Sequence, residues 1–273
     1  MVRSLWTAAT GMIAQQQNVD TIANNLANVN TVGYKTETNE FKSLLYQTMQ
    51  TRTTTANAEQ KPIGAQVGLG VRNSSITSQF TNGALLESES QTSFAIQGKG
   101  FFAVRGNDGQ TYYTRNGEFN FNLNAGGGLA LSNSDGLPVL NTNGQPIVLT
   151  GDYVANRVTV DANGQVCYPD ANNNPQPIAG MQIGMTQFQN PKGLDKEGDS
   201  LYSVTAASGQ PMNEATNNNL EKSVIRQGYL EGSNVQVADE MVNLIVAQRA
   251  YELNSKAITT TDDMMQTANQ LKR

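Results

Sequence analysis

The side chains that could carry chemistry in this chain are few, and most of them are carboxylates. Histidine is absent from the 273 residues, which excludes Ser-His-Asp and Cys-His catalysis and histidine-containing zinc sites. A carboxylate pair can cleave a glycosidic bond, but the spacing of the acidic residues singles out no pair. We therefore predict no catalytic residue, cofactor, metal site or small-molecule substrate, and a secreted carboxylate hydrolase acting on cell-wall sugar stays the alternative. The acidic residues in or near expected loops are Glu118, Asp152, Asp195, Glu197 and Asp199.

The remaining reactive positions favour structure over chemistry. The single cysteine, Cys167, cannot form a disulfide within the chain, and its alternating neighbours predict a small buried apolar residue. The run Asp161-Ala162-Asn163-Gly164 lacks the third acidic position and the bidentate Glu of a calcium loop, so a hairpin turn is expected there. No glycine-rich phosphate-binding motif is present in the sequence.

Charge is sparse and mildly acidic. Charged residues make up 15 % of the chain, and the formal net charge is -5. Duplex nucleic acid is therefore an unsuitable partner, because neutralised phosphates supply most of that affinity. No run approaches the roughly 18 apolar residues of a membrane span, and the N-terminus lacks a signal-peptide core, so an exported chain would keep it. The cations near the N-terminus have acidic residues among them and are predicted to be solvated surface: Lys35, Lys42, Arg52, Lys61 and Arg72.

The first 30 residues carry a helical repeat. Apolar residues follow an alternating three/four spacing, with Gln15 in the one polar slot, which predicts a helix over 5–29 with a heptad seam. Ser4 is expected to cap its start, and Gly33 is expected to terminate the segment just after it. The positions in the seam are Leu5, Ala8, Met12, Val19, Ile22, Leu26 and Val29.

The last 40 residues repeat this pattern. One row recurs at every seventh position, and a complementary row starts at Met241 and continues through three polar residues, Gln248, Ser255 and Asp262. Ser233 with Gln236 predicts a capping box at the helix start, and a break is possible within 259–261. The first row contains Val237, Leu244, Tyr251, Ile258 and Met265, and the stripe is widened by Val242, Ile245 and Val246.

The middle of the chain has the pattern of antiparallel β structure. Six Asn-Gly or Asp-Gly pairs supply the positive φ angles that tight hairpins need. In Phe101-Phe102 and Tyr112-Tyr113, one member of each pair is expected to face the core. We predict a β domain over 76–219, with 46–75 and 220–231 as a linking segment. The glycines of the six pairs are Gly83, Gly109, Gly117, Gly136, Gly144 and Gly164.

The predicted fold class is α+β. Residues 1–45 and 232–273 would form paired terminal helices in a coiled-coil-like bundle, with the antiparallel all-β domain inserted between them. Neither helix is expected to be stable alone, and a pair with polar residues in its seams would still expose apolar surface. Further copies of the chain could cover it, which predicts polymerisation coupled to ordering of the termini. The alternative is a monomeric adhesin or binding module whose helices pack on the β domain.

Several stretches carry a family resemblance. The run Ile22-Ala23-Asn24-Asn25-Leu26-Ala27-Asn28-Val29-Asn30-Thr31-Val32-Gly33-Tyr34-Lys35 closely resembles the N-terminal signature of flagellar rod and hook proteins. Residues 228–235, 248–252 and 254–257 resemble the C-terminal signature, and 96–102 resembles the entry to the β domain. Within the family, 3–6 and 44–48 are similar to the distal-rod member. A longer proximal-rod or hook-family paralogue is the closest alternative.

The resemblance implies a mechanical function. Paired helices would line a tube, the linking segment would wrap them and the β domain would face outward. Subunits would stack helically into a stiff distal rod that transmits torque through the periplasm to the hook and encloses the export channel. The implied partners are further copies of the chain, proximal-rod proteins, hook protein, the surrounding basal-body rings and the flagellar export apparatus. The implied location is the basal body, reached without a cleaved signal peptide.

The predicted assembly interface combines the two helical stripes with the asparagines of the signature. Asparagines near a helix end lower helix propensity, so their amides are expected to bond neighbouring chains or to cap the turn at Gly33. Segment 46–70 is expected to lie between subunits and to stiffen the rod. The predicted interface residues are Leu5, Met12, Val19, Ile22, Asn24, Asn25, Leu26 and Asn28 near the N-terminus, and Val237, Met241, Leu244, Ile245, Tyr251 and Ile258 near the C-terminus.

Overall fold

The chain divides into two compact units. The computed structural model describes residues 2–50, 65–123, 127–151, 153–170, 174–217 and 219–271. Unit 1 comprises Met1–Ala27, Glu37–Ser78 and Gln236–Arg273, and unit 2 comprises Asn28–Thr36 and Gln79–Val235. Among the described residues, no helix has the length and apolar character needed to cross a membrane.

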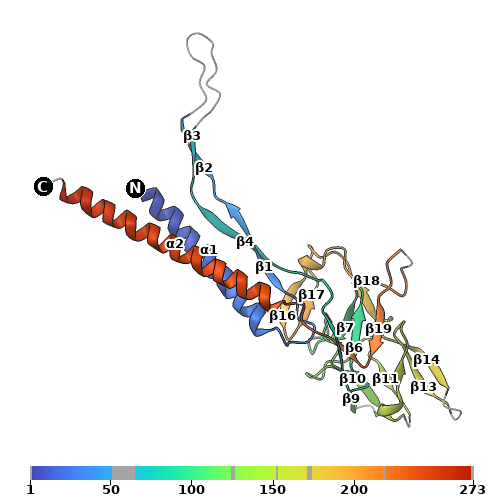
Figure 1. The fold of residues 1–273 in the computed structure, drawn as a ribbon. Coiled ribbons are helices and arrows are strands. Elements are labelled where there is room, and N and C mark those ends of the chain that lie inside the picture. The colour runs from blue at the N-terminus through green and yellow to red at the C-terminus, as the bar shows by residue number, and fades with distance from the viewer. Residues whose placement is uncertain are drawn as a thin grey trace, which may run out of the picture. The chain divides into compact units, whose positions relative to one another are not determined.

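Two long helices dominate unit 1. Helix α1 (Val2–Ala27) and helix α2 (Val237–Gln270) contact each other along their lengths, as Figure 1 shows in blue and red. Both predicted helices are confirmed, but their ends differ from expectation. Ser4 lies inside the first turn of α1 rather than at its cap, and α1 ends at Ala27, two residues before the predicted end at 29.

The start of α2 also differs from the predicted capping box. The residue before the helix is Gln236, and its side chain makes no capping bond. Ser233 Oγ instead accepts a hydrogen bond from the Val235 N–H at 3.3 Å. Asp239 and Glu240 in the first turn place negative charge at the positive end of the helix dipole, which favours the same start.

Helix α2 continues through its threonine run without a break. Thr259 Oγ1 and Thr260 Oγ1 each donate to the Lys256 carbonyl at 2.9 Å, and Thr261 Oγ1 donates to the Ala257 carbonyl at 2.6 Å. Because these hydroxyls are satisfied within their own helix, the run does not end it.

The segment after α1 forms antiparallel ribbons. Strand β1 (Glu37–Ser43) pairs with β4 (Val71–Ser78), and β2 (Tyr46–Gln50) pairs with β3 (Ala65–Gly68). Residues 37–43, expected with the helices, are therefore a strand. The ends of the expected linking segment 46–75 are a paired ribbon, while 51–64 lie outside the described residues.

Unit 2 is built from antiparallel strands, so the α+β class is confirmed. Its largest sheet has six strands in the order β16-β17-β8-β7-β15-β18, and smaller sheets have the orders β11-β10-β9, β12-β13-β14, β19-β6 and β20-β5. The bounds are β5 (Leu85–Glu87), β6 (Phe94–Gln97), β7 (Phe101–Arg105), β8 (Thr111–Thr114), β9 (Asn120–Leu123), β10 (Leu129–Ser132), β11 (Val148–Leu149), β12 (Thr159–Val160), β13 (Gln165–Pro169), β14 (Pro175–Gln182), β15 (Met185–Gln187), β16 (Asp195–Gly198), β17 (Leu201–Ser203), β18 (Met212–Asn213), β19 (Val224–Gln227) and β20 (Tyr229–Glu231), with 3-10 turns η1 (Ala155–Arg157) and η2 (Pro191–Gly193).

The last strands of unit 2 lie in a region that was expected to be a linking segment. Strand β19 pairs with β6, and β20 pairs with β5, over residues 224–231. These pairings join the end of the β region to its beginning. Residues 224–231 are therefore part of unit 2, which is called the β unit below.

Strand β7 is covered on both faces. Phe102 and Val104 belong to the larger hydrophobic cluster of unit 2, and Phe101 and Ala103 belong to a second cluster with Tyr113. Alternating side chains of a strand point to opposite faces, so both phenylalanines are buried where one was expected to be. The six-stranded sheet therefore separates two cores.

Four of the six predicted Asn-Gly or Asp-Gly turns are confirmed by a positive φ at the glycine. The other two glycines serve close packing: a Cβ on Gly83 would meet the Gly232 carbonyl oxygen, and a Cβ on Gly117 would meet the Phe94 carbonyl oxygen. The four glycines with positive φ are Gly109, Gly136, Gly144 and Gly164.

Candidate assembly interface

The predicted apolar row of α1 lies on the packed side of the helix. Ile22 is buried, and the other members of the row that belong to the predicted interface are half-buried: Leu5, Met12, Val19 and Leu26. None of the five is exposed in the isolated subunit. The heptad pattern therefore identified the side of α1 that contacts other parts of unit 1.

The contact row of α2 is displaced by one residue from the predicted complementary row. Glu240, Ala247 and Thr261 are buried, and Asn254 lies against Gly11 of α1. These positions recur every seven residues, one residue before Met241, Gln248, Ser255 and Asp262. Of the predicted first row, Leu244, Ile258 and Met265 are half-buried. The row of α2 that lies against α1 thus contains small and polar side chains.

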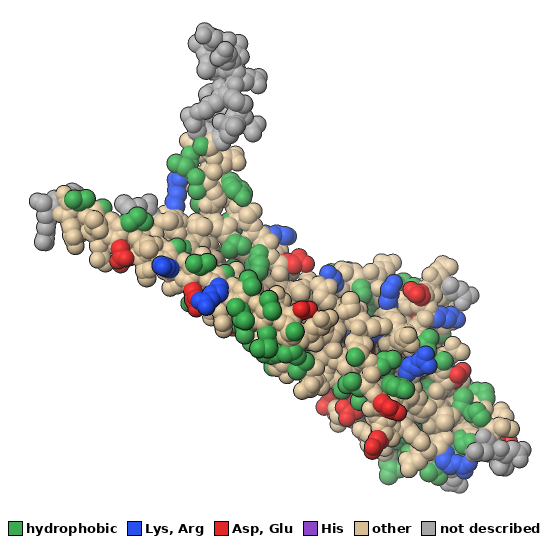
Figure 2. Space-filling view, in the orientation of Figure 1, with side chains coloured by type: hydrophobic (Ala, Val, Ile, Leu, Met, Phe, Trp, Pro, Cys, Tyr) green, Lys and Arg blue, Asp and Glu red, His purple; other side chains and the backbone are tan. Residues whose placement is uncertain are grey.

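The displacement leaves much of the apolar surface of α2 uncovered. The exposed residues include Met241 (52 %), Ile245 (56 %) and Val246 (62 %), and Figure 2 shows apolar side chains gathered over the helices of unit 1. Contiguous exposed apolar side chains mark interaction surfaces. The other exposed large apolar residues of the two helices are Trp6, Ile13, Val237, Val242, Tyr251, Leu253 and Met264, with Leu271 directly after α2.

The signature asparagines do not all face outward. Asn25 is 1 % exposed; its Oδ1 accepts from the Glu37 N–H at 2.9 Å, and its Nδ2 donates to the Glu37 carbonyl at 2.9 Å. The same Nδ2 donates to Glu240 Oε1 of α2 at 3.3 Å. Asn28 Oδ1 accepts from Thr31 Oγ1 at 3.0 Å, whereas Asn24 is exposed. At Asn25, the amide therefore bonds its own chain rather than a neighbour.

Glu240 is a carboxylate in the contact between two helices. Burial raises its pKa above the ordinary value, and the nearby Asp239 charge acts in the same direction. The hydrogen bond from Asn25 opposes this shift because it stabilises the charged form. The side chain is thus held by one amide donor in a poorly solvated position.

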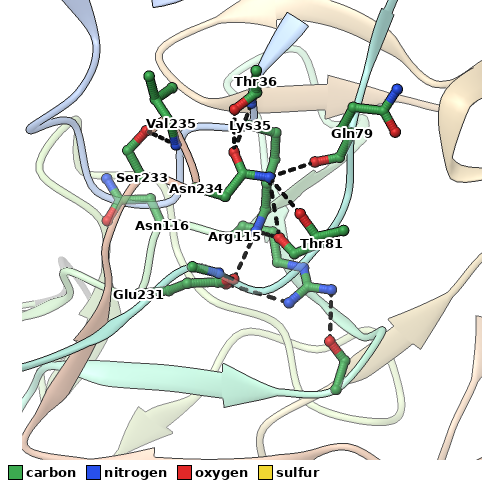
Figure 3. A network of polar contacts seen from close by, with 12 residues as sticks. Lys35, Thr36, Gln79, Thr81, Arg115, Asn116, Glu231, Ser233, Asn234 and Val235 are labelled. Carbon is green, nitrogen blue, oxygen red and sulfur yellow. Dashed lines mark hydrogen bonds and ion pairs between the residues drawn. The ribbon is translucent and has the colours of Figure 1, made fainter. Parts of the chain in front are cut away.

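A buried ionic cluster in unit 2 joins three distant segments of the sequence (Figure 3). Glu231 Oε1 lies 2.6 Å from Lys35 Nζ, and Glu231 Oε2 lies 3.3 Å from Arg115 Nη1. All three side chains are 0–1 % exposed. A buried cation without a partner is strongly destabilising, so one carboxylate supports two cations.

Backbone groups complete the coordination of this cluster. Lys35 Nζ donates to the Thr81 carbonyl at 2.8 Å, and the Gly83 N–H donates to Glu231 Oε1 at 3.1 Å. Arg115 Nη2 donates to the Gly98 carbonyl at 2.9 Å. Burial, with a smaller contribution from Arg115, lowers the pKa of Lys35, while Glu231 acts in the opposite direction. The cluster therefore ties 33–36, 81–83, 98 and 115 to 231.

Asn234 adds a second tie beside the cluster (Figure 3). Its Oδ1 accepts from the Thr36 N–H at 2.7 Å and from Thr36 Oγ1 at 2.8 Å. Its Nδ2 donates to the Gln79 carbonyl at 2.8 Å and to Thr81 Oγ1 at 2.8 Å. One amide thus holds two chain segments that leave the β unit.

Sequence reasoning missed these ties. Lys35 was expected to be solvated surface and is instead buried, while Lys42 and Arg72 are exposed as predicted; Arg52 and Lys61 lie outside the described residues. Three of the residues, Lys35, Glu231 and Asn234, lie inside the signature stretches. Their place in those stretches was the one sequence feature that could have indicated a structural role. Nothing in the sequence marked Arg115.

The residues considered for chemistry form no site among the described parts of the chain. Glu118, Asp195, Glu197 and Asp199 are exposed, Asp152 lies outside the described residues, and no group of three His, Cys, Asp or Glu side chains could hold a metal ion there. Cys167 on β13 is half-buried rather than buried, and burial raises the pKa of its thiol.

Comparison with known proteins decides what this architecture belongs to. Residues 5–35 match the description "Flagella basal body rod protein", 95–168 match "Flagellar hook protein FlgE/F/G D1 domain", and 226–271 match "Flagellar basal body rod FlgEFG protein C-terminal". The flagellar basal-body rod protein FlgG of Borreliella burgdorferi is 43 % identical over 279 residues, covering 100 % of both chains.

This chain belongs to the flagellar basal-body rod protein family. Two further relatives are FlgG of Agrobacterium fabrum, 42 % identical with 96 % of this chain and 97 % of the relative covered, and the flagellar hook-basal body complex protein FlhP of Bacillus subtilis, 31 % identical with 100 % of each covered. As a rod-family member, the chain is a structural component of the flagellar basal body and serves motility.

Proposed function

We propose that this rod-family chain is the distal-rod subunit, which polymerises helically into a stiff shaft. The shaft transmits torque from the motor to the hook and encloses the export channel. Proteins named FlgG are 37–43 % identical to this chain, against 31 % for FlhP, over 96 % or more of the chain in each case. This difference favours the distal-rod member over a hook-basal body paralogue such as FlhP.

The observation that carries polymerisation is the uncovered apolar surface of α2. Met241, Ile245 and Val246 are each more than half exposed, although they lie on a long, regular helix. Burying such side chains contributes roughly 1.5–3 kcal/mol each relative to exposure. A second copy of the chain, offering its own helices, is the occupant that this proposal requires.

In the proposed polymer, the two helices form a coiled-coil-like pair that lines the tube. Helices α1 and α2 supply the inner wall, 46–75 the linking segment, and the β domain the outer surface. Proximal-rod proteins, hook protein, basal-body rings and the export apparatus are the proposed partners. Subunits would reach the periplasm-spanning rod through that apparatus, with the N-terminus retained.

Electron microscopy of purified protein under polymerising conditions tests this function. Ile245→Asp should abolish tubes while leaving circular dichroism unchanged, because Ile245 is already exposed in the single subunit. Asn243→Asp is the matched control, since it adds the same charge at an exposed position two residues away. Normal tubes from Ile245→Asp would reject this surface as the assembly interface.

Two further measurements distinguish the rod subunit from the two alternatives, a monomeric binding module and a carboxylate hydrolase. A monomeric binding module would form no tubes under any condition and would show protected helices in hydrogen exchange. A carboxylate hydrolase would release soluble sugar from peptidoglycan. The acidic loop residues that such an enzyme would use are exposed wherever the structure describes them, which favours neither cleavage nor a substrate pocket.

A further inference from the structure

One row of α1 and one row of α2 lack large apolar side chains at a seven-residue spacing. On α2 the row is Glu240, Ala247, Asn254 and Thr261; on α1 it is Ser4, Gly11, Asn18 and Asn25. In heptad pairs, a polar residue at a seam position specifies the register at a cost in stability. We propose that these two rows set the register of the antiparallel helix pair.

Two contacts define the register. Asn25 Nδ2 donates to Glu240 Oε1 at 3.3 Å, and a Cβ on Gly11 would lie 2.9 Å from Asn254 Nδ2. The two contacts are fourteen residues apart on each helix and run in opposite directions along the chain. This spacing places Asn18 opposite Ala247, which is 1 % exposed.

A groove between the helices lies in the same region. It is lined by Gln16 and Val19 of α1 and by Gln248, Tyr251 and Glu252 of α2, which fall between the two contacts on each helix. The register is thus supported along the central half of α1.

Slipped registers lose these contacts. A shift of seven residues places either Ser4 or Asn18 opposite Asn254, in place of Gly11, the one residue of the row without a side chain. In one of those registers Glu240 also lies beyond the last turn of α1, where Asn25 no longer reaches it. An unpaired polar group in a poorly solvated contact costs roughly 1–3 kcal/mol, which disfavours that register. The other register is disfavoured because Ser4 brings a side chain to the close approach that Gly11 makes to Asn254.

Cross-linking of the full chain tests this proposal in a Cys167→Ala background. A short bis-maleimide should join Gln16→Cys to Gln248→Cys about tenfold faster than it joins Gln16→Cys to Ser255→Cys, the position one heptad away. None of these three positions belongs to the rows. Equal rates would show that the pair has no fixed register.

Removing the polar contacts should then release the register. In the variant Asn25→Leu, Glu240→Leu and Asn254→Ala, the slipped link should rise to within about threefold of the aligned link. If the slipped link stays about tenfold slower, the connecting segments set the register and the proposal fails. Loss of both links would also overturn it, because the rows would then be needed for pairing itself.

This inference deepens the proposed function, since the same helices are proposed to polymerise, but its test can fail independently. Cross-linking is measured on single subunits at concentrations where no tubes form. The Ile245→Asp experiment concerns a different face of α2. A fixed register without polymerisation would retain this inference and reject the rod proposal, and tubes built from an unregistered pair would do the reverse.

Discussion

Lys35 and Glu231 are 196 residues apart in the sequence, and their side chains form a 2.6 Å ion pair that solvent barely reaches. Each stands in a signature stretch at one end of the chain, and Arg115 from the β unit shares the same carboxylate. The pair therefore joins the two segments that end where the chain leaves unit 2, after Thr36 and after Val235. Its removal should affect that unit as a whole.

Glu231→Gln should destabilise the β unit by about 3–5 kcal/mol, because it leaves two buried cations without a counter-charge. Urea unfolding followed by near-ultraviolet circular dichroism measures this loss. Glu221→Gln is the control: the Lys99–Glu221 pair spans 3.7 Å between side chains that are 76 % and 85 % exposed, so no measurable change is expected. An unchanged midpoint for Glu231→Gln would show that the cluster does not stabilise the unit.

Gly33→Ala should destabilise the β unit more than Gly109→Ala does. Both glycines have similar positive φ angles, +71° and +79°, so both substitutions carry the left-handed strain of roughly 1–2 kcal/mol. A Cβ at Gly33 would also lie 2.7 Å from the Arg115 carbonyl carbon, whereas nothing lies within 4 Å at Gly109. The difference between the unfolding temperatures of the two variants measures the steric contribution at Gly33. Equal decreases in unfolding temperature would contradict this close approach.

Acidification should strengthen the helix contact through Glu240. Its pKa is raised in the folded state, so the folded form holds the proton more tightly than the unfolded form. The resulting stabilisation is complete below the unfolded pKa of about 4.3 and is lost as the pH rises through the folded pKa. Unfolding of the helices, followed at 222 nm from pH 4.5 to 7, should show this trend in the wild type.

The corresponding substitution is Glu240→Gln, which keeps an acceptor for Asn25 and removes the titration. Its unfolding temperature should depend less on pH than that of the wild type. Asp263→Asn, at an exposed position of the same helix, should leave the wild-type dependence intact. If Glu240→Gln and wild type show parallel curves, Glu240 does not titrate in this pH range.

Deletion of 46–70 should soften the proposed rod. Strands β1 and β4 pair on either side of this segment, so a short turn from Leu45 to Val71 can close the remaining ribbon. Tubes of the deletion variant should bend more than wild-type tubes in electron micrographs. Equal straightness would remove this segment from the account of stiffness.

Local patterns predicted much of the secondary structure. Seven-residue spacing identified the two helices and the packed side of α1, because a helix brings every third or fourth residue to one face. Four of the Asn-Gly or Asp-Gly pairs are turns, since glycine adopts positive φ without steric cost. Residues 22–35 carried the family resemblance that the comparisons confirmed. These features depend on neighbours within one or two helical turns.

Tertiary structure decided the features that join distant residues. Local spacing predicted that the complementary row of α2 starts at Met241. In the structure, Asn254 packs against Gly11 and Glu240 accepts a hydrogen bond from Asn25. The row of α2 that contacts α1 therefore lies one residue earlier. Lys35 has the neighbours of a surface lysine, yet Glu231 and the Thr81 carbonyl make its burial possible. The strands at 224–231 likewise depend on partners more than a hundred residues earlier. The sequence contains these partners but does not show which of them lie close together in space. A charge or an amide can be buried only where a partner lies within hydrogen-bond distance.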